Sequence, residues 1–341
     1  MNLGTSLGKL KLKNPVLVAS GTFGHAMEFE KFIDLKKLGG IVTKTITLKP
    51  RLGNSPVRIV ETPSGILNAI GLQNPGVEKF IEDKLPYLRK IKVPILVSIM
   101  GYRVEELVEL VRILEKEDGI DGYELNLSCP NVAYAPAAAG PAAAPARFST
   151  SNSSCRKTSA QAPRHPRLPR IEVSARMFAH DEKMIHEATS AVRKETRRIL
   201  ISKLGPDVSD IGKMALAAER GGADAVSLIN TFIAMAIDVK TRKPVLANKT
   251  GGLSGPCIRP IAVRMVWEVA SQLKISVIGI GGIMNANDCL EFLIAGASAI
   301  QVGTANFMNP AASVEILEDL KNFMRQNKIN SLKSIIGSVR D

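Results

Sequence analysis

The stretch Tyr123–Asn131, with the sequence YELNLSCPN, decides how the rest of the chain is interpreted. Its two leucines alternate with polar residues, which is the period-two pattern of a β-strand. Pro130 ends this strand, because proline has no N–H to donate to a ladder. Two amides and a thiol therefore collect where the strand ends: Asn126, Asn131 and Cys129.

These three side chains indicate a particular chemistry. Amides offer hydrogen-bond donors and acceptors without charge, which suits a flat, neutral heterocycle with several C=O and N–H groups. A thiol accepts a proton when its thiolate is stabilised or transiently formed. The strand end therefore predicts a ligand site in which Cys129 acts as a base. The alternative is a buried structural cysteine beside a Pro–Asn turn.

The length and composition are those of a globular protein with a large core. The chain has 341 residues, of which 45% are hydrophobic, enough for one large domain or two ordinary ones. We find no run of about twenty apolar residues and no signal-peptide order at the N-terminus, so we expect no membrane association. Four scattered cysteines without a C-x-x-C pair argue against a disulfide framework or a metal site and favour the cytoplasm.

One segment, residues 133–177, differs from the rest in composition. It holds twelve alanines, six prolines and seven Lys or Arg residues against one acid, and it shows no hydrophobic periodicity. We predict a disordered or loosely draped insertion that begins four residues after Cys129. Nearly half of the net charge of +13 lies there, so the remainder resembles an anion-binding enzyme more than a nucleic-acid-binding protein.

Outside that segment, short β-branched runs alternate with amphipathic helical stretches. The predicted strands are Val16–Ala19, Gly40–Lys44, Ile95–Ile99, Gly122–Leu127, Ile199–Leu204, Ala225–Ile229, Val277–Ile280 and Ala299–Val302. The predicted helices include Val104–Glu117, Asp181–Arg197, Ser209–Arg220, Pro260–Leu273, Ala286–Ala295 and Ala311–Gln326. This alternation implies parallel strands joined by right-handed crossovers. We therefore predict an α/β fold, a single-domain (β/α)₈ TIM barrel over residues 1–341, with its chemistry at the C-terminal ends of the strands.

The predicted strand ends carry the residues that such a site needs. Lys44 and Lys203 each lie at the end of an apolar strand, which favours an anionic or electron-rich ligand; the alternative is a structural ion pair. Gly281-Gly282 and Gly303-Thr304 present backbone N–H groups where barrels commonly hold a phosphate. The alternative for them is ordinary glycine at tight turns. Two further stretches are predicted as loops: Asn68–Asn74 and the glycine-rich Gly251–Gly255.

A series of motifs in order resembles the dihydroorotate dehydrogenase family, and most closely its NAD-linked subclass of class 1. The motifs are Thr43–Thr45, Asn68–Asn74, Glu124–Asn131, Ile229–Thr231, Thr250–Pro256, Gly281-Gly282 and Val302–Thr304. The resemblance covers residues 1–132 and about 178–341. It implies a cytoplasmic FMN enzyme that oxidises dihydroorotate to orotate in pyrimidine synthesis. Ser98 departs from the family, which often has Asn at that position.

The resemblance also implies roles for individual residues. Cys129 would remove a proton from C5 of dihydroorotate while hydride passes from C6 to N5 of the flavin. The implied substrate contacts are Lys44, Asn68, Ala69, Ile70, Gly71, Leu72, Asn126, Asn131, Asn230 and Thr231. The implied FMN contacts are Ser20, Lys44, Thr45, Ser98, Asn126, Lys203, Ile229, Gly255, Gly281, Gly282, Gly303 and Thr304.

Partners are implied as well. The pattern from Asn230 to Asp238, followed by Arg242–Pro244, resembles the NAD-linked form, in which the barrel pairs with a subunit carrying FAD and a [2Fe–2S] cluster. A homodimer of the barrel chain is also expected. Three alternatives stay open: a dihydrouridine synthase acting on tRNA, a reductase of the dihydropyrimidine dehydrogenase type, and a non-catalytic phosphate-binding barrel disabled by the insertion.

Overall fold

The computed structural model of the chain describes residues 1–128, 178 and 180–340. The predicted insertion at 133–177 lies outside the described residues, and so do Cys129 and Asn131.

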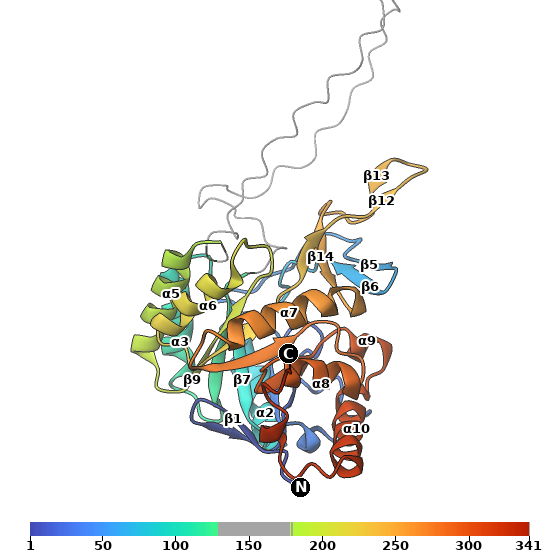
Figure 1. Cartoon of the computed structure of the whole chain (residues 1–341). Coiled ribbons are helices and arrows are strands. Elements are labelled where there is room, and N and C mark those ends of the chain that lie inside the picture. The colour runs from blue at the N-terminus through green and yellow to red at the C-terminus, as the bar shows by residue number, and fades with distance from the viewer. Residues whose placement is uncertain (129–177, 179, 341) are drawn as a thin grey trace, which may run out of the picture.

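Eight parallel strands close into a barrel in the order β10-β15-β16-β3-β4-β7-β8-β9 (Figure 1). They are β3 (Val16–Val18), β4 (Gly40–Val42), β7 (Ile95–Ile99), β8 (Gly122–Asn126), β9 (Ile199–Leu204), β10 (Ala225–Leu228), β15 (Ser276–Ile280) and β16 (Ala299–Val302). Each predicted strand is present, and no boundary differs by more than two residues. The predicted TIM barrel is confirmed.

Helices cover the outside of the barrel (Figure 1). The predicted ones are α3 (Val104–Leu114), α5 (Glu182–Glu195), α6 (Ile211–Arg220), α7 (Arg259–Ala270), α8 (Ala286–Ile294) and α10 (Ala312–Gln326). Those not predicted are η1 (Leu35–Lys37), α1 (Gly76–Lys79), η2 (Phe80–Lys84), α2 (Leu85–Ile91), η3 (Pro256–Ile258), α9 (Ala305–Met308) and η4 (Leu332–Ser334). In α3, the buried residues Leu107, Leu110, Val111 and Leu114 form the single stripe that packs on the barrel.

The barrel interior changes from apolar to polar along the strands. At the N-terminal end, the hairpin of β1 (Thr5–Leu7) and β2 (Leu10–Leu12) packs its leucines against a layer that includes Ile201, Ala225 and Ala299. Since side chains of one strand face the same way every second residue, the next inward positions are two residues further on. Those positions hold polar side chains, all buried: Lys203, Ser227 and Gln301.

An antiparallel sheet that the sequence analysis did not predict stands at the opposite end from β1 (Figure 1). It consists of β5 (Ile59–Thr62), β6 (Gly65–Asn68), β11 (Phe232–Ala234) and β14 (Gly251–Ser254), in the order β11-β14-β6-β5. We call it the mouth sheet. The hairpin of β12 (Ile237–Asp238) and β13 (Lys243–Pro244) projects beyond it.

The mouth sheet corrects two predictions. The expected loop at Gly251–Gly255 is mostly strand β14, and Asn68 is the last residue of β6 rather than the head of a loop. Glycine in β14 lets neighbouring groups pack closely against its backbone and does not indicate a flexible loop. A Cβ on Gly252 would collide with the side chain of Thr231. In the described part of the chain, no helix is long and apolar enough to cross a membrane.

His25 makes the fold sensitive to acid. Its side chain is buried against Phe80, with ring centroids 5.5 Å apart, and neither ring nitrogen has a hydrogen-bond partner among the residues that the structure describes. Burial lowers the pKa of His25 to about 4, an effect that the nearby Glu28 only partly opposes. Between pH 6.5 and 4, His25 therefore binds a proton in the unfolded chain but stays neutral in the folded chain. This contribution to stability is complete above pH 6.5 and is lost as the pH falls through that window.

We expect His25→Phe to remove this acid sensitivity. The wild type should lose about 2–3 kcal/mol of unfolding free energy through His25 between pH 7 and pH 4, and the variant should not show that part of the loss. Denaturant unfolding at a series of pH values measures it. His186→Gln, at an exposed histidine of α5, is the matched control and should retain the wild-type pH dependence. An identical pH dependence in wild type and His25→Phe would contradict the assignment.

Candidate active site

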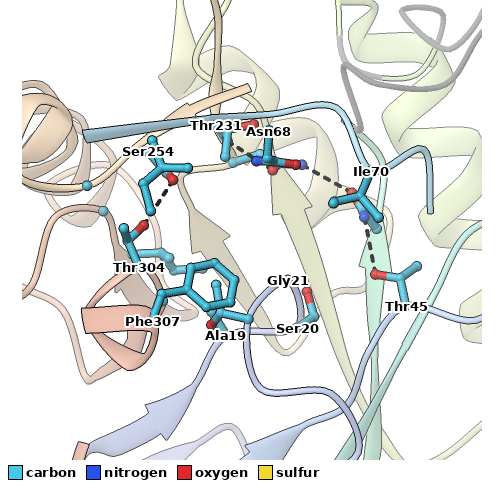
Figure 2. A pocket seen from close by; sticks show the side chains of 18 of the residues that line it. Ala19, Ser20, Gly21, Thr45, Asn68, Ile70, Thr231, Ser254, Thr304 and Phe307 are labelled. Atoms are coloured by element: carbon cyan, nitrogen blue, oxygen red, sulfur yellow. Dashed lines mark hydrogen bonds between the residues drawn. The ribbon is translucent and has the colours of Figure 1, made fainter. Parts of the chain in front are cut away.

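A cavity of about 450 Å³ opens between the C-terminal ends of the barrel strands and the mouth sheet. Its size lies within the range of about 300–1,000 Å³ that is typical of small-molecule sites. Figure 2 shows Ala19, Ser20 and Gly21 from the end of β3 on one side. Asn68, at the end of β6, lies across the cavity from them. Barrel and mouth sheet together therefore build the site.

Most of the predicted site residues line this cavity. They are Ser20, Lys44, Thr45, Asn68, Ile70, Gly71, Leu72, Asn126, Lys203, Ile229, Asn230, Thr231, Gly255, Gly281, Gly282, Gly303 and Thr304. Two do not line it: Ala69 is buried against Leu67 and Leu246, and Ser98 is buried behind Thr45. Cys129 and Asn131 lie outside the described residues.

Hydrogen bonds hold two amides, at the ends of β8 and β10, in fixed orientations. The Asn230 amide donates to Asn126 Oδ1 at 3.2 Å and to the Ser128 carbonyl at 3.1 Å. The Asn126 amide in turn donates to Thr45 Oγ1 at 3.4 Å, and Thr45 is bonded to Ser98 Oγ at 2.9 Å. Ser98 therefore does not touch the cavity but orients the Thr45 hydroxyl from behind its wall. This chain of contacts also presents oriented amides to a ligand at no further ordering cost.

A second part of the cavity is formed by glycine backbone. Gly255, Gly281 and Gly282 have φ angles of 104°, 135° and 68°, a region that favours glycine, so they bring bare backbone to the surface of the cavity. Among the described residues, a Cβ added at Gly303 would contact only Ala19 Cβ, at 3.6 Å. Beside them, Thr304 Oγ1 donates to Ser254 Oγ at 2.9 Å (Figure 2). This glycine-lined part of the cavity, the cradle, brings backbone close to the ligand space, as phosphate-binding turns do.

The two lysines of the cavity differ in their partners. Within the described ranges Lys44 forms no ion pair, and burial lowers its pKa, partly opposed by the charge of Glu28. The Nζ of Lys203 lies 3.7 Å from Glu124 Oε1, so the structural ion pair left open above is present for Lys203. Since Lys203 also lines the cavity, it faces both a carboxylate and the ligand space.

The sequence analysis missed the apolar wall of the cavity, which is formed by Ile66, Ile258 and Phe307. A turn signal was available for part of it, because Pro63-Ser64 separates two short runs with β propensity. No group of three or more potential metal ligands occurs among the described residues. The site thus combines a glycine cradle, fixed amides, two cations and an apolar wall.

Comparisons with known proteins agree on one family. The family model for dihydroorotate dehydrogenase matches residues 2–324. A protein of Thermodesulfovibrio yellowstonii is 46% identical over 339 residues, covering 99% of both chains. Proteins of Geotalea uraniireducens and Thermoanaerobacter sp. (strain X514) are 44% and 46% identical, covering 99% and 100% of this chain and 98% and 99% of their own. All three are named dihydroorotate dehydrogenase B (NAD(+)), catalytic subunit.

Proposed function

Because the chain belongs to the dihydroorotate dehydrogenase family, we propose that its cavity binds both FMN and dihydroorotate and that Cys129 is the catalytic base. The family oxidises dihydroorotate to orotate in pyrimidine biosynthesis and depends on FMN. The observation that carries the proposal is the single cavity that joins the glycine cradle to the fixed amides. The match to this family favours none of the three alternative functions.

The residues fit FMN. The cradle of Gly255, Gly281, Gly282 and Gly303 suits its phosphate, because a side chain at the first three positions would be strained and one at Gly303 would enter the cavity. Lys203 of β9 supplies a positive charge where the cavity meets the barrel interior, which we call the floor of the cavity. When bound, FMN supplies the acceptor for the hydride.

The amides and Lys44 fit the substrate. Dihydroorotate carries ring C=O and N–H groups, which Asn68, Asn126 and Asn230 can pair with, and a carboxylate. Lys44 lies in the cavity without an ion pair in the described ranges, so we assign it to that carboxylate. We assign the proton transfer to Cys129, which accepts the proton from C5 of dihydroorotate as hydride leaves C6.

Anaerobic mixing tests this function. The purified chain, loaded with FMN, should lose its flavin absorbance when dihydroorotate is added, and one orotate should form for each FMN reduced. A chain that binds FMN but neither bleaches nor forms orotate would contradict the proposed activity.

We expect Gly303→Val to lose FMN without losing the fold. The barrel has room for the first carbon of the new side chain, since Ala19 Cβ is the one atom of the described residues within 4 Å of it, but the rest of the side chain occupies ligand space. FMN affinity should fall at least about tenfold, which corresponds to about 1.4 kcal/mol. Flavin absorbance of the purified protein and fluorescence titration measure it, with the melting temperature of the apoprotein as control. A variant that retains full FMN content would place the phosphate elsewhere.

The names of the relatives imply an electron-transfer partner, and we propose that this chain also assembles with such a subunit. We further propose that this partner carries FAD and a [2Fe–2S] cluster, that the barrel chain forms a homodimer, and that the assembly is cytoplasmic. The barrel chain alone should then reduce its FMN with dihydroorotate but should not reduce NAD⁺. Reduction of NAD⁺ by the barrel chain alone would contradict the partner.

A further inference from the structure

A buried carboxylate lies behind the floor of the cavity and takes no part in the function described so far. Glu124, on β8, is fully buried, while Lys203 on β9 lines the cavity with a side chain that is 7% exposed. Glu124 Oε2 accepts hydrogen bonds from Gln301 Nε2 at 2.7 Å and from Ser227 Oγ at 3.1 Å. Glu124 Oε1 accepts none from the described residues and lies 3.7 Å from Lys203 Nζ.

This geometry is unlike that of an ion pair built for stability. Burying two charges costs more than their attraction returns unless hydrogen bonds satisfy both groups, and apolar residues often fill such a site equally well. Here the adjacent layer of the same barrel is filled by Ile201, Ala225 and Ala299. In the described part of the chain, no acceptor forms a hydrogen bond with the Lys203 ammonium, so its donors are available to a ligand.

The other two contacts determine where the carboxylate points. Ser227 and Gln301 come from β10 and β16 and hold the same oxygen, Oε2, so the carboxylate cannot rotate freely. Oε1 is thereby left facing Lys203. The charges are thus ordered, with the carboxylate inside the barrel and the ammonium between it and the cavity.

We propose that Glu124 is a positioning residue that holds the Lys203 ammonium at the cavity floor, where the ammonium stabilises bound FMN in its reduced form. Two-electron reduction puts negative charge on the flavin ring system, and a fixed positive charge in a site of low dielectric favours it. This inference rests on the proposed binding of FMN. It assigns to Glu124 an influence on the flavin potential that runs through Lys203.

The sign of the effect separates this role from its alternatives. A carboxylate that acted on the flavin directly would disfavour added negative charge, so removing it would raise the midpoint potential. If Glu124 acts through Lys203, removing its charge leaves a buried ammonium unpaired. The ammonium is then no longer held at the floor, less positive charge faces the flavin, and the potential falls. A purely structural role would leave the potential unchanged.

Glu124→Gln is the test, because the amide oxygen still accepts from Ser227 and Gln301 while the charge is gone. In the purified, FMN-loaded chain we expect the preference for reduced over oxidised FMN to fall about tenfold, which lowers the midpoint potential by about 30 mV for a two-electron couple. Equilibration with a redox dye under anaerobic conditions measures it. An unchanged or raised potential would overturn the proposal.

A second pair of variants covers the case in which Glu124→Gln does not fold. Lys203→Met alone leaves the carboxylate, whereas Glu124→Gln/Lys203→Met removes both charges, a replacement that buried pairs often tolerate. If Glu124 acts through Lys203, the double variant has a potential no lower than that of Lys203→Met. A further fall in the double variant would overturn the proposal.

Glu115→Gln is the matched control. The Glu115 carboxylate follows α3 and is held by Tyr123 and Thr196 at 2.8 and 2.7 Å, away from the cavity. Its loss should lower the melting temperature and leave the flavin potential unchanged. FMN content is measured first on the wild type, so that a chain without FMN counts against the proposed function and a loaded chain with unshifted variants counts against this inference.

Discussion

Replacing Cys129 with serine is expected to abolish most dihydroorotate oxidation at neutral pH while FMN remains bound. A serine hydroxyl is a far weaker acid than a thiol, so its basic form is scarce at pH 7. The lost proton-transfer contribution is about 10²–10⁴-fold in rate. Both steady-state turnover with a dye acceptor and the rate of flavin bleaching under anaerobic conditions measure the loss. Partial recovery of the rate at high pH would support a role in proton transfer.

Cys257→Ser is the control for this substitution. Cys257 is a half-buried thiol that does not line the cavity, and burial raises its pKa. The same chemical change there should leave both the turnover and the FMN content at wild-type values. Equal turnover in Cys129→Ser and the wild type would mean that Cys129 is a structural cysteine, the alternative raised by its neighbouring Pro–Asn turn.

The barrel was predictable because its signals are local. A strand such as β9, with the sequence ILISKL, is a short, largely apolar run, and eight such runs alternate with helical stretches. The positions of Lys44 and Asn126 follow from the same pattern, since parallel strands bring their C-terminal ends to one rim. Local pattern was therefore sufficient for the strands and for most residues of the cavity.

The mouth sheet was not predictable in the same way, because its pairing is long-range. Asn68 of β6 pairs with Gly252 of β14, 184 positions further along the chain. Gly251–Ser254 contains two glycines, which favour loops unless a partner strand is present. Similarly, the pattern around Glu124 places it on one face of β8, but only the closed barrel determines that it meets Lys203 and Gln301.

Replacing Lys44 with methionine is expected to weaken orotate binding more than FMN binding. Lys44 lies in the cavity without an ion pair in the described ranges, and burial lowers its pKa. The charged form of Lys44 is therefore destabilised in the empty site and is stabilised when an anion binds beside it. Hydrogen bonds to charged groups contribute about 1.5–3 kcal/mol, which corresponds to roughly a 10- to 150-fold loss of orotate affinity. Titration of orotate against the flavin spectrum measures the loss.

The pH dependence of binding gives a second readout for Lys44. If orotate binds the charged ammonium, its affinity for the wild type must fall as the pH rises through the pKa of Lys44, which burial places below the ordinary value of 10.5. The Lys44→Met variant should lack that fall. Lys49→Met, at an exposed lysine outside the cavity, should match the wild type in affinity and in pH profile. Equal orotate affinities in Lys44→Met and the wild type would refute the assignment of the substrate carboxylate to Lys44.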